Sequence, residues 1–189
     1  MGEVIEINII AQQKAMLKKL VKFMATLKRE HIIGRTIEIM DDWEYKNVFQ
    51  CDDLKDVDQY LDDKIICITE MFPQGIMGVT SECVNEEYIF CVWYNFKCDI
   101  TKDEYIYLNK NFIEYLSTDL INDGIKLCGI GKETIFTYAE NVYQVVEKSH
   151  NIDIWIVNKN VYQKNCFNQC RIYSLEEYSY DIESAVIIF

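Results

Sequence analysis

The strongest strand pattern in the chain is YIFCVWYNFK, at residues 88–97. Aromatic and β-branched side chains fill this segment, and both kinds are favoured on the pleated surface of a sheet. Shorter apolar runs of the same kind occur on either side of it, at residues 64–70 (KIICITE), 125–130 (IKLCGI) and 152–158 (IDIWIVN). The sequence therefore predicts a β-sheet whose strands are spread along the chain.

Weaker patterns predict further strands. Short runs of β-favouring residues occur at residues 35–40, 76–80, 133–136 and 185–189. Residues 4–10 (VIEINII) alternate weakly and fit either a strand or the start of a helix.

Helical patterns lie between these strands. Residues 11–29 place apolar side chains on one side of a helix and lysines on the other, at about 100° per residue. Capping-box sequences of Thr and Glu at residues 101–104 and 137–140 predict the starts of two more helices. Residues 52–61 predict a fourth helix, with Asp52 as its N-cap. Its inward-facing residues would be Leu54, Val57 and Leu61.

The order of these elements is mixed, because some strands follow one another directly and others are separated by helices. Such an order is typical of α+β proteins. We predict a mixed, mainly antiparallel sheet with about four helices packed mostly on one face. No internal repeat and no Gly-, Ser- or Pro-rich linker divides the sequence, which predicts a single domain over residues 1–189.

The chain is strongly acidic. Its 189 residues contain 31 Asp and Glu against 19 Lys and Arg, which gives a net charge of -12. This balance argues against binding to duplex nucleic acid, because affinity for phosphate needs an excess of cations. The sequence has no basic leader, and no apolar run reaches the roughly 20 residues of a membrane span. We therefore expect a cytoplasmic protein that binds neither nucleic acid nor a membrane.

The eight cysteines are expected to be reduced thiols, because several lie inside apolar runs and the expected compartment is reducing. A structural zinc site needs about four soft ligands. The nearest pattern is Cys166-x3-Cys170 with His150 as a third ligand, and the chain has only two histidines. We predict no metal and no other cofactor, and leave open whether these three residues form a site.

No motif for catalysis stands out. GIGKET at residues 129–134 resembles a phosphate-binding loop, but Lys126 stands where the first glycine is needed and Glu133 would repel phosphate. A hairpin turn is the better interpretation. His31 and His150 each follow a predicted helix, where a cation complements the helix dipole. We therefore predict no catalytic residue and a protein that is not an enzyme.

The negative charge is concentrated in one tract. Residues 41–63 hold nine acidic side chains and two lysines, whereas residues 1–35 hold seven basic and three acidic residues, a balance of +4. On the predicted helix several aspartates share one face, and like charges at helical spacing are destabilising. A basic partner would give a reason to gather them, because complementary potentials steer association.

Two large aromatic residues, Trp43 and Tyr45, stand among the first acids of this tract. Aromatic side chains surrounded by charge are favoured at binding hot spots. We predict that nine residues bind the partner: Asp41, Asp42, Trp43, Glu44, Tyr45, Asp52, Asp56, Asp62 and Asp63.

This profile resembles the immunity proteins of bacterial polymorphic-toxin and contact-dependent inhibition systems, which are small, acidic, cytosolic α/β or α+β proteins. The likeness is carried by the acidic tract at residues 41–63, with Trp43 and Tyr45, and by the lack of catalytic motifs and export signals; it extends to no residue-level motif. The resemblance implies tight binding of one cognate toxin, often a basic nuclease, whose active site or substrate path would be blocked. The carboxylates would then take the place of the substrate's phosphates.

Other interpretations stay open. An acidic face is often only a solvated face that maintains solubility, and Trp43 and Tyr45 could simply be core residues. A phage or viral effector would use the same charge to mimic nucleic acid. An enzyme that uses carboxylates, or Cys166 and Cys170, in a pocket is a further alternative, as is an oligomerising domain. The basic face of residues 14–29 could contact anionic lipid or nucleic acid, although such faces are more often solvated or paired with the chain's own acids.

Overall fold

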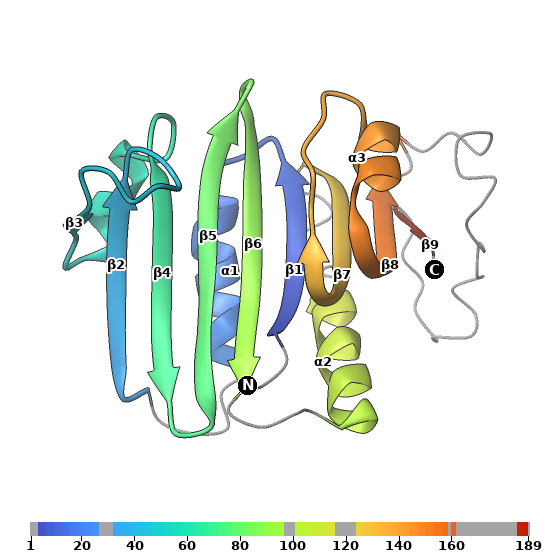
Figure 1. The fold of residues 1–189 in the computed structure, drawn as a ribbon, viewed down its shortest axis with the longest axis horizontal. Helices are drawn as coiled ribbons and strands as arrows, with labels where there is room; N and C mark the ends of the chain where they lie inside the picture. Colours follow the sequence, from blue (N-terminus) through green and yellow to red (C-terminus); the bar gives the residue numbers. More distant parts are fainter. Residues whose placement is uncertain are drawn as a thin grey trace.

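The computed structural model describes residues 4–26, 32–96, 101–115, 124–158, 160–161 and 185–188. Nine strands in this part of the chain form one sheet, in the order β3-β2-β4-β5-β6-β1-β7-β8-β9, and every pairing between them is antiparallel. Two helices lie behind the sheet in Figure 1, and a third lies in front of one end. The fold is α+β, with a mainly antiparallel sheet and helices mostly on one face, as predicted.

The strands are β1 (Val4–Ala11), β2 (Gly34–Met40), β3 (Phe49–Gln50), β4 (Ile65–Phe72), β5 (Gly75–Val84), β6 (Glu87–Phe96), β7 (Ile125–Ile135), β8 (His150–Asn158) and β9 (Ala185–Ile188). The helices are α1 (Met16–Thr26), the 3-10 helix η1 (Leu54–Gln59), α2 (Lys102–Tyr115) and α3 (Val142–Lys148). The pattern at residues 88–97 thus lies almost wholly in β6. Residues 4–10 form the strand β1, which pairs with β6 along its whole length.

Strands β5 and β6 are joined by a two-residue turn. Val84 pairs with Glu87 across it, and the two central residues, Asn85 and Glu86, have positive φ angles of 52° and 65°. Positive φ at both positions is typical of the type I′ turn, whose twist matches that of the flanking strands. Strand β5 continues to this turn and is therefore longer than the strand predicted at residues 76–80.

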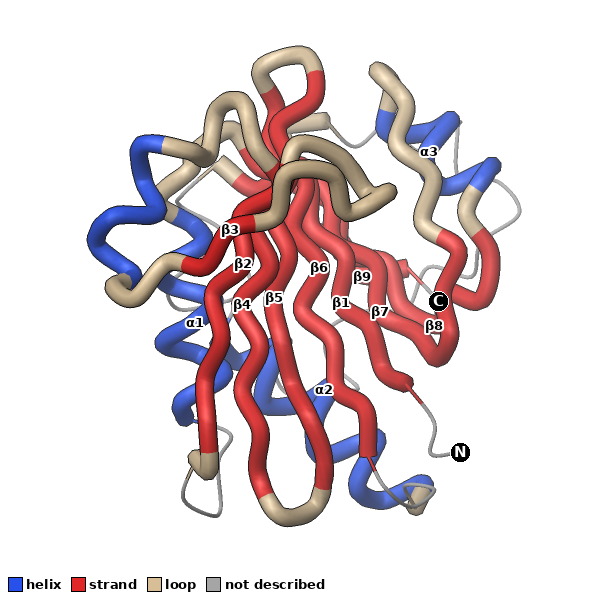
Figure 2. The backbone as a smooth tube through the Cα atoms, turned by 60° about the vertical axis from the view of Figure 1, so that its left-hand side comes forward, coloured by secondary structure: helices blue, strands red, loops and turns tan. Residues whose placement is uncertain are grey.

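One face of the sheet is covered by α1 and α2 (Figure 1, Figure 2). The predicted apolar side of α1 is buried, including Leu20, Phe23 and Met24. Phe23 also contacts α2, because its ring centroid lies 5.2 Å from that of Phe112. Alternate residues of the central strands complete this core, and their removal from water is the main source of stability.

Helix α3 packs on the opposite face, over β1, β7 and β8. Its Val145 is fully buried in a second, smaller core with Leu127 and Trp155. The indole of Trp155 lies over Gly129, where a Cβ would come within 2.8 Å of the ring. Among the described residues, no helix covers the rest of this face, over β2, β4, β5 and β6.

The prediction of an α-helix at residues 52–61 is wrong about the type of helix. The segment forms a 3-10 helix of 6 residues, and its N-cap is Asp53 instead of Asp52. Val57 and Leu61 are fully buried, as predicted. Because a 3-10 helix has about three residues per turn and η1 is short, the predicted α-helical face does not form. The aspartates expected to share it are Asp52, Asp56 and Asp63.

The hairpin turn predicted at residues 129–134 is also wrong. Strand β7 continues through this segment to Ile135, with an irregular register against β8 after Ile130. Glu133 has a φ of 47°, and the side-chain amide of Asn151 donates a 3.0 Å hydrogen bond to its carbonyl oxygen. A bulge therefore replaces the turn, because pairing with β1 and β8 holds the strand together.

Of the two predicted capping boxes, one forms. The N–H of Glu104 donates to Thr101 Oγ1 at 3.2 Å, and the N–H of Thr101 donates to Glu104 Oε2 at 2.8 Å. The sequence at residues 137–140 does not cap α3. That helix starts later, with Asn141 as N-cap, and the Asn141 side chain accepts a 2.9 Å hydrogen bond from the N–H of Tyr143.

Candidate partner-binding surface

The candidate surface begins with the loop of residues 41–48, which joins β2 to β3. The loop extends from the end of β2 on the side of the sheet opposite α1 (Figure 2). The side chains of Trp43 and Tyr45 are 51% and 64% exposed. Aromatic side chains are enriched in protein interfaces. The loop therefore presents two groups of the kind that interfaces bury.

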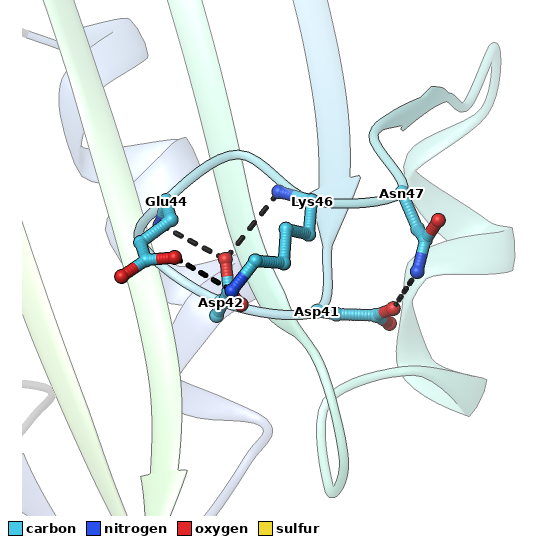
Figure 3. Close-up of polar contacts among 5 residues, drawn as sticks. All are labelled: Asp41, Asp42, Glu44, Lys46 and Asn47. Carbon is cyan, nitrogen blue, oxygen red and sulfur yellow. Dashed lines mark hydrogen bonds and ion pairs between the residues drawn. The ribbon is translucent and has the colours of Figure 1, made fainter.

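Asp42 orders this loop from within (Figure 3). Its Oδ1 accepts hydrogen bonds from the backbone N–H of Glu44, at 2.9 Å, and of Lys46, at 3.3 Å. The Nζ of Lys46 lies 3.1 Å from Asp42 Oδ2 and 2.6 Å from Glu44 Oε2. An Asp side chain that bonds the backbone two residues later stabilises a local turn. The shape of the loop is thus set by its own polar groups.

Further contacts join the loop to the sheet. Asn47 donates a hydrogen bond to Asp41 (Figure 3), and Asp41 forms an ion pair with Lys64, which directly precedes β4. The indole N–H of Trp43 donates a 2.8 Å hydrogen bond to Glu82 Oε2 of β5. The loop is therefore held both at its base and through Trp43.

The backbone is strained at the more exposed aromatic residue. Tyr45 has a φ of 59°, and Asn47 has a φ of 51°. Asparagine adopts this left-handed region readily, whereas it costs a bulky residue roughly 1–2 kcal/mol. Strain of this kind concentrates at functional positions. The surroundings therefore impose the conformation of Tyr45.

Part of the acidic tract is neutralised by lysines from the first helical segment. Lys14 Nζ lies 2.9 Å from Asp62 Oδ2, and Lys18 forms an ion pair with Asp58. The hydroxyl of Tyr88 also donates to Asp62. The only sign of this pairing in the sequence is that the two lysines and the two aspartates are each spaced by four residues. For these two lysines, pairing with the chain's own acids is confirmed.

Other acids of the tract remain available. Asp52, Asp56 and Asp63 are exposed, and among the described residues none of them forms an ion pair. The predicted binding set therefore divides into two parts. Trp43, Tyr45 and these three aspartates face solvent without an ion pair, whereas Asp41, Asp42, Glu44 and Asp62 are each paired with a lysine.

The paired carboxyls keep their negative charge. Hydrogen bonds from Lys64 and Asn47 lower the pKa of Asp41, and hydrogen bonds from Tyr88 and Lys14 lower the pKa of Asp62. Each carboxylate is favoured because donors stabilise its charged form. These acids therefore stay ionised well below neutral pH.

The described residues contain no group of three or more His, Cys, Asp or Glu side chains placed to hold a metal ion. His150 is exposed at the start of β8, and Cys166 and Cys170, its suggested co-ligands, lie outside the described residues. The described cysteines are free thiols: Cys51, Cys67, Cys83, Cys91 and Cys128. In the same part of the chain, no helix has the length and apolar character needed to cross a membrane.

The chain was compared with protein-family models, curated proteins and solved structures, and none of them matches. The functional argument therefore depends on the loop of residues 41–48 and on the three exposed aspartates.

Proposed function

We propose that this is a non-enzymatic protein that binds a basic protein partner, and that it acts in the cytoplasm as an immunity protein against a toxin of nuclease type. The observation that carries the proposal is the exposed side chain of Tyr45, on a loop whose backbone is held at a φ of 59°. An exposed aromatic group in a strained, internally ordered loop has no evident role in stabilising the fold.

The order of the loop favours binding. A partner that contacts Trp43 and Tyr45 would bury two large rings, and such rings are common at hot spots. Because Asp42 already holds the loop in one shape, little conformational entropy would be lost on association. The loop of residues 41–48 therefore presents Trp43 and Tyr45 in a conformation that is already formed before binding.

The exposed aspartates of the tract would add an electrostatic contribution to binding by the loop. Asp52, Asp56 and Asp63 lie exposed in the segment that follows the loop. Exposed charges of one sign steer an oppositely charged partner and raise its association rate. On a nuclease these carboxylates would occupy positions that substrate phosphates otherwise take, and the bound protein would block access to the active site.

The test is capture of the partner from a lysate of the source organism at low ionic strength. The bait proteins are the wild-type chain, a W43A/Y45A variant and single D52K, D56K and D63K variants together with the combined D52K/D56K/D63K variant. The exposed Glu147→Lys on α3 is the control for each single variant, because it reverses one charge outside the tract. The captured protein is identified, purified and titrated across a salt series. We expect to capture a basic protein whose affinity for the wild-type chain falls as the salt concentration rises. The D52K/D56K/D63K variant should bind this protein at least about tenfold more weakly than the wild type, mainly because association is slower.

Inhibition of the captured protein's own activity by the wild-type chain would support the immunity role. An affinity that does not change with salt, or equal capture by the loop variant and the wild type, would overturn the proposal. Capture of many unrelated nucleic-acid-binding proteins would also overturn the proposal, and would indicate instead that the protein mimics the charge of nucleic acid.

A further inference from the structure

The sheet face opposite α1 and α2 carries exposed apolar side chains. In β4, β5 and β6 the residues that face α1 and α2 are mostly buried, and the alternate residues are mostly partly exposed. A sheet with one solvated face normally places polar side chains there. This face instead includes Met71 and Ile76, which are 43% and 37% exposed, and the partly exposed Trp93. Apolar groups gathered on an open surface indicate an interaction site.

Trp93 occupies a row of residues that crosses the strands. Its direct neighbours are Gly78 on β5 and Glu6 on β1. The indole lies over Gly78, because a Cβ at that position would come within 2.4 Å of Trp93 Cζ2. The residue without a side chain therefore makes room for a broad ring.

The carboxylate of Glu6 is fixed in position. Its Oε2 accepts hydrogen bonds from the Thr134 N–H at 2.6 Å and from Thr134 Oγ1 at 2.7 Å. The amide of the buried Asn8 donates to the same hydroxyl at 2.9 Å. These donors are neutral, so they orient the carboxylate without cancelling its charge.

The charge of this face has one sign. By strand alternation Glu38 and Glu82 point to the same side as Glu6. Among the described residues of β1, β2, β4, β5 and β6, the single cation is Arg35. Arg35 belongs to the other side, where it pairs with the buried Glu70 at 2.5 Å. On these five strands the face therefore combines carboxylates and apolar groups without a cation, and on the neighbouring strand β7 the cation Lys126 pairs with Glu87 of β6.

We propose that this open face, marked by Glu6, Ile76, Thr80, Glu82 and Trp93, is the docking surface for an extended cationic segment of the basic partner. A lysine or arginine would lie over the Trp93 ring, because a cation is attracted to an aromatic face. Glu6, on the neighbouring strand, would add to the negative potential that attracts the segment. Apolar side chains of the segment would cover the Ile76 region. The inference rests on the proposed function, since it gives the same partner a second contact that adjoins the loop through the Trp43–Glu82 hydrogen bond.

The test uses a short dye-labelled peptide in which lysine alternates with valine, and a counterpart with glutamate in place of lysine. Binding is measured by fluorescence anisotropy at low ionic strength. Thr80 lies in the middle of the face, between Cys67 and Cys91 of the adjoining strands. The matched variants are T80K and T80Q, which add side chains of similar length and differ in charge. We expect the wild type and T80Q to bind the lysine peptide, T80K to bind it about tenfold more weakly, and none to bind the glutamate peptide.

Thermal unfolding of both variants checks that they fold. E6Q is a second variant that leaves the size of the side chain unchanged, and it should weaken peptide binding about threefold. Equal binding by T80K and T80Q, or by E6Q and the wild type, would overturn the inference.

The loop variant Y45A separates the two proposals, because it keeps the hydrogen bond between Trp43 and Glu82 and should leave peptide binding unchanged. Specific peptide binding without capture of any basic protein would overturn the proposed function alone. If the chain captures a basic protein whose binding depends on the loop, but does not bind the lysine peptide, this inference alone would be overturned.

Discussion

Lys14 and Asp62 are 48 residues apart in the chain, and their side chains form an ion pair with 2.9 Å between Nζ and Oδ2. The other oxygen of the same carboxylate accepts a hydrogen bond from the hydroxyl of Tyr88, on β6. The segment before α1, the end of the acidic tract and the sheet therefore meet at one carboxylate. This acid serves the fold, so the binding surface is best tested on Asp52, Asp56 and Asp63.

The first prediction concerns the ionisation of Tyr88. Its hydrogen bond to Asp62 raises the pKa of Tyr88 from 10.0 to about 12. The folded state favours the neutral phenol, so this contribution to stability is fully present below pH 10.0 and is lost as the pH rises toward 12. Wild type should therefore lose stability relative to Tyr88→Phe over this range, as measured by urea unfolding. An ultraviolet difference titration that places the Tyr88 phenol near its ordinary pKa would contradict the contact.

The second prediction separates binding from stability at Tyr45. Tyr45→Gly removes an exposed ring and relieves the positive φ at this position. The free energy of unfolding should stay the same or rise by up to about 1 kcal/mol, because glycine adopts this backbone region without strain. Affinity for the captured partner should fall by roughly tenfold or more. A variant that loses both stability and binding would show that Tyr45 is a structural residue.

The third prediction tests the close approach of Trp93 to the sheet. Gly78→Ala would place a Cβ within 2.4 Å of the indole and 2.8 Å of the Ile68 carbonyl oxygen. We expect a loss of about 1–3 kcal/mol in the free energy of unfolding, because the space between the indole and the sheet has no room for the methyl group. Gly34→Ala is the matched control, since its Cβ would meet only the end of the Met71 side chain, at 3.0 Å. Equal stabilities of the two variants in urea would contradict the position of the indole.

The fourth prediction compares two candidate caps of α3. Asn141→Ala removes the side chain that accepts from the Tyr143 N–H, and should cost about 1 kcal/mol. Glu140→Ala alters the capping-box residue that the structure does not use, and should change stability by less than about 0.5 kcal/mol. Denaturant unfolding of the two variants decides between the caps. A larger loss for Glu140→Ala would restore the box predicted from the sequence.

Local patterns predicted many of the elements because local side chains determine them. The β-favouring run at residues 88–97, the apolar side of α1 and the capping box of α2 all follow from spacing within a few residues. The bulge in β7 was missed for the opposite reason. Its GIGKET sequence suits a turn, and only pairing with strands on both sides keeps it extended.

The division of the acidic tract follows the same rule. The positions of the acids along the sequence were enough to find the concentration of negative charge and the aromatic pair within it, whereas the exposure of Trp43 and Tyr45 was decided by the fold. Which acids are free depended on the folded chain, because Lys14 and Lys18 reach Asp62 and Asp58 only after distant segments pack together. The open face around Trp93 likewise exists only in the assembled sheet, since its residues come from five strands whose neighbours are set by long-range hydrogen bonds and not by local sequence.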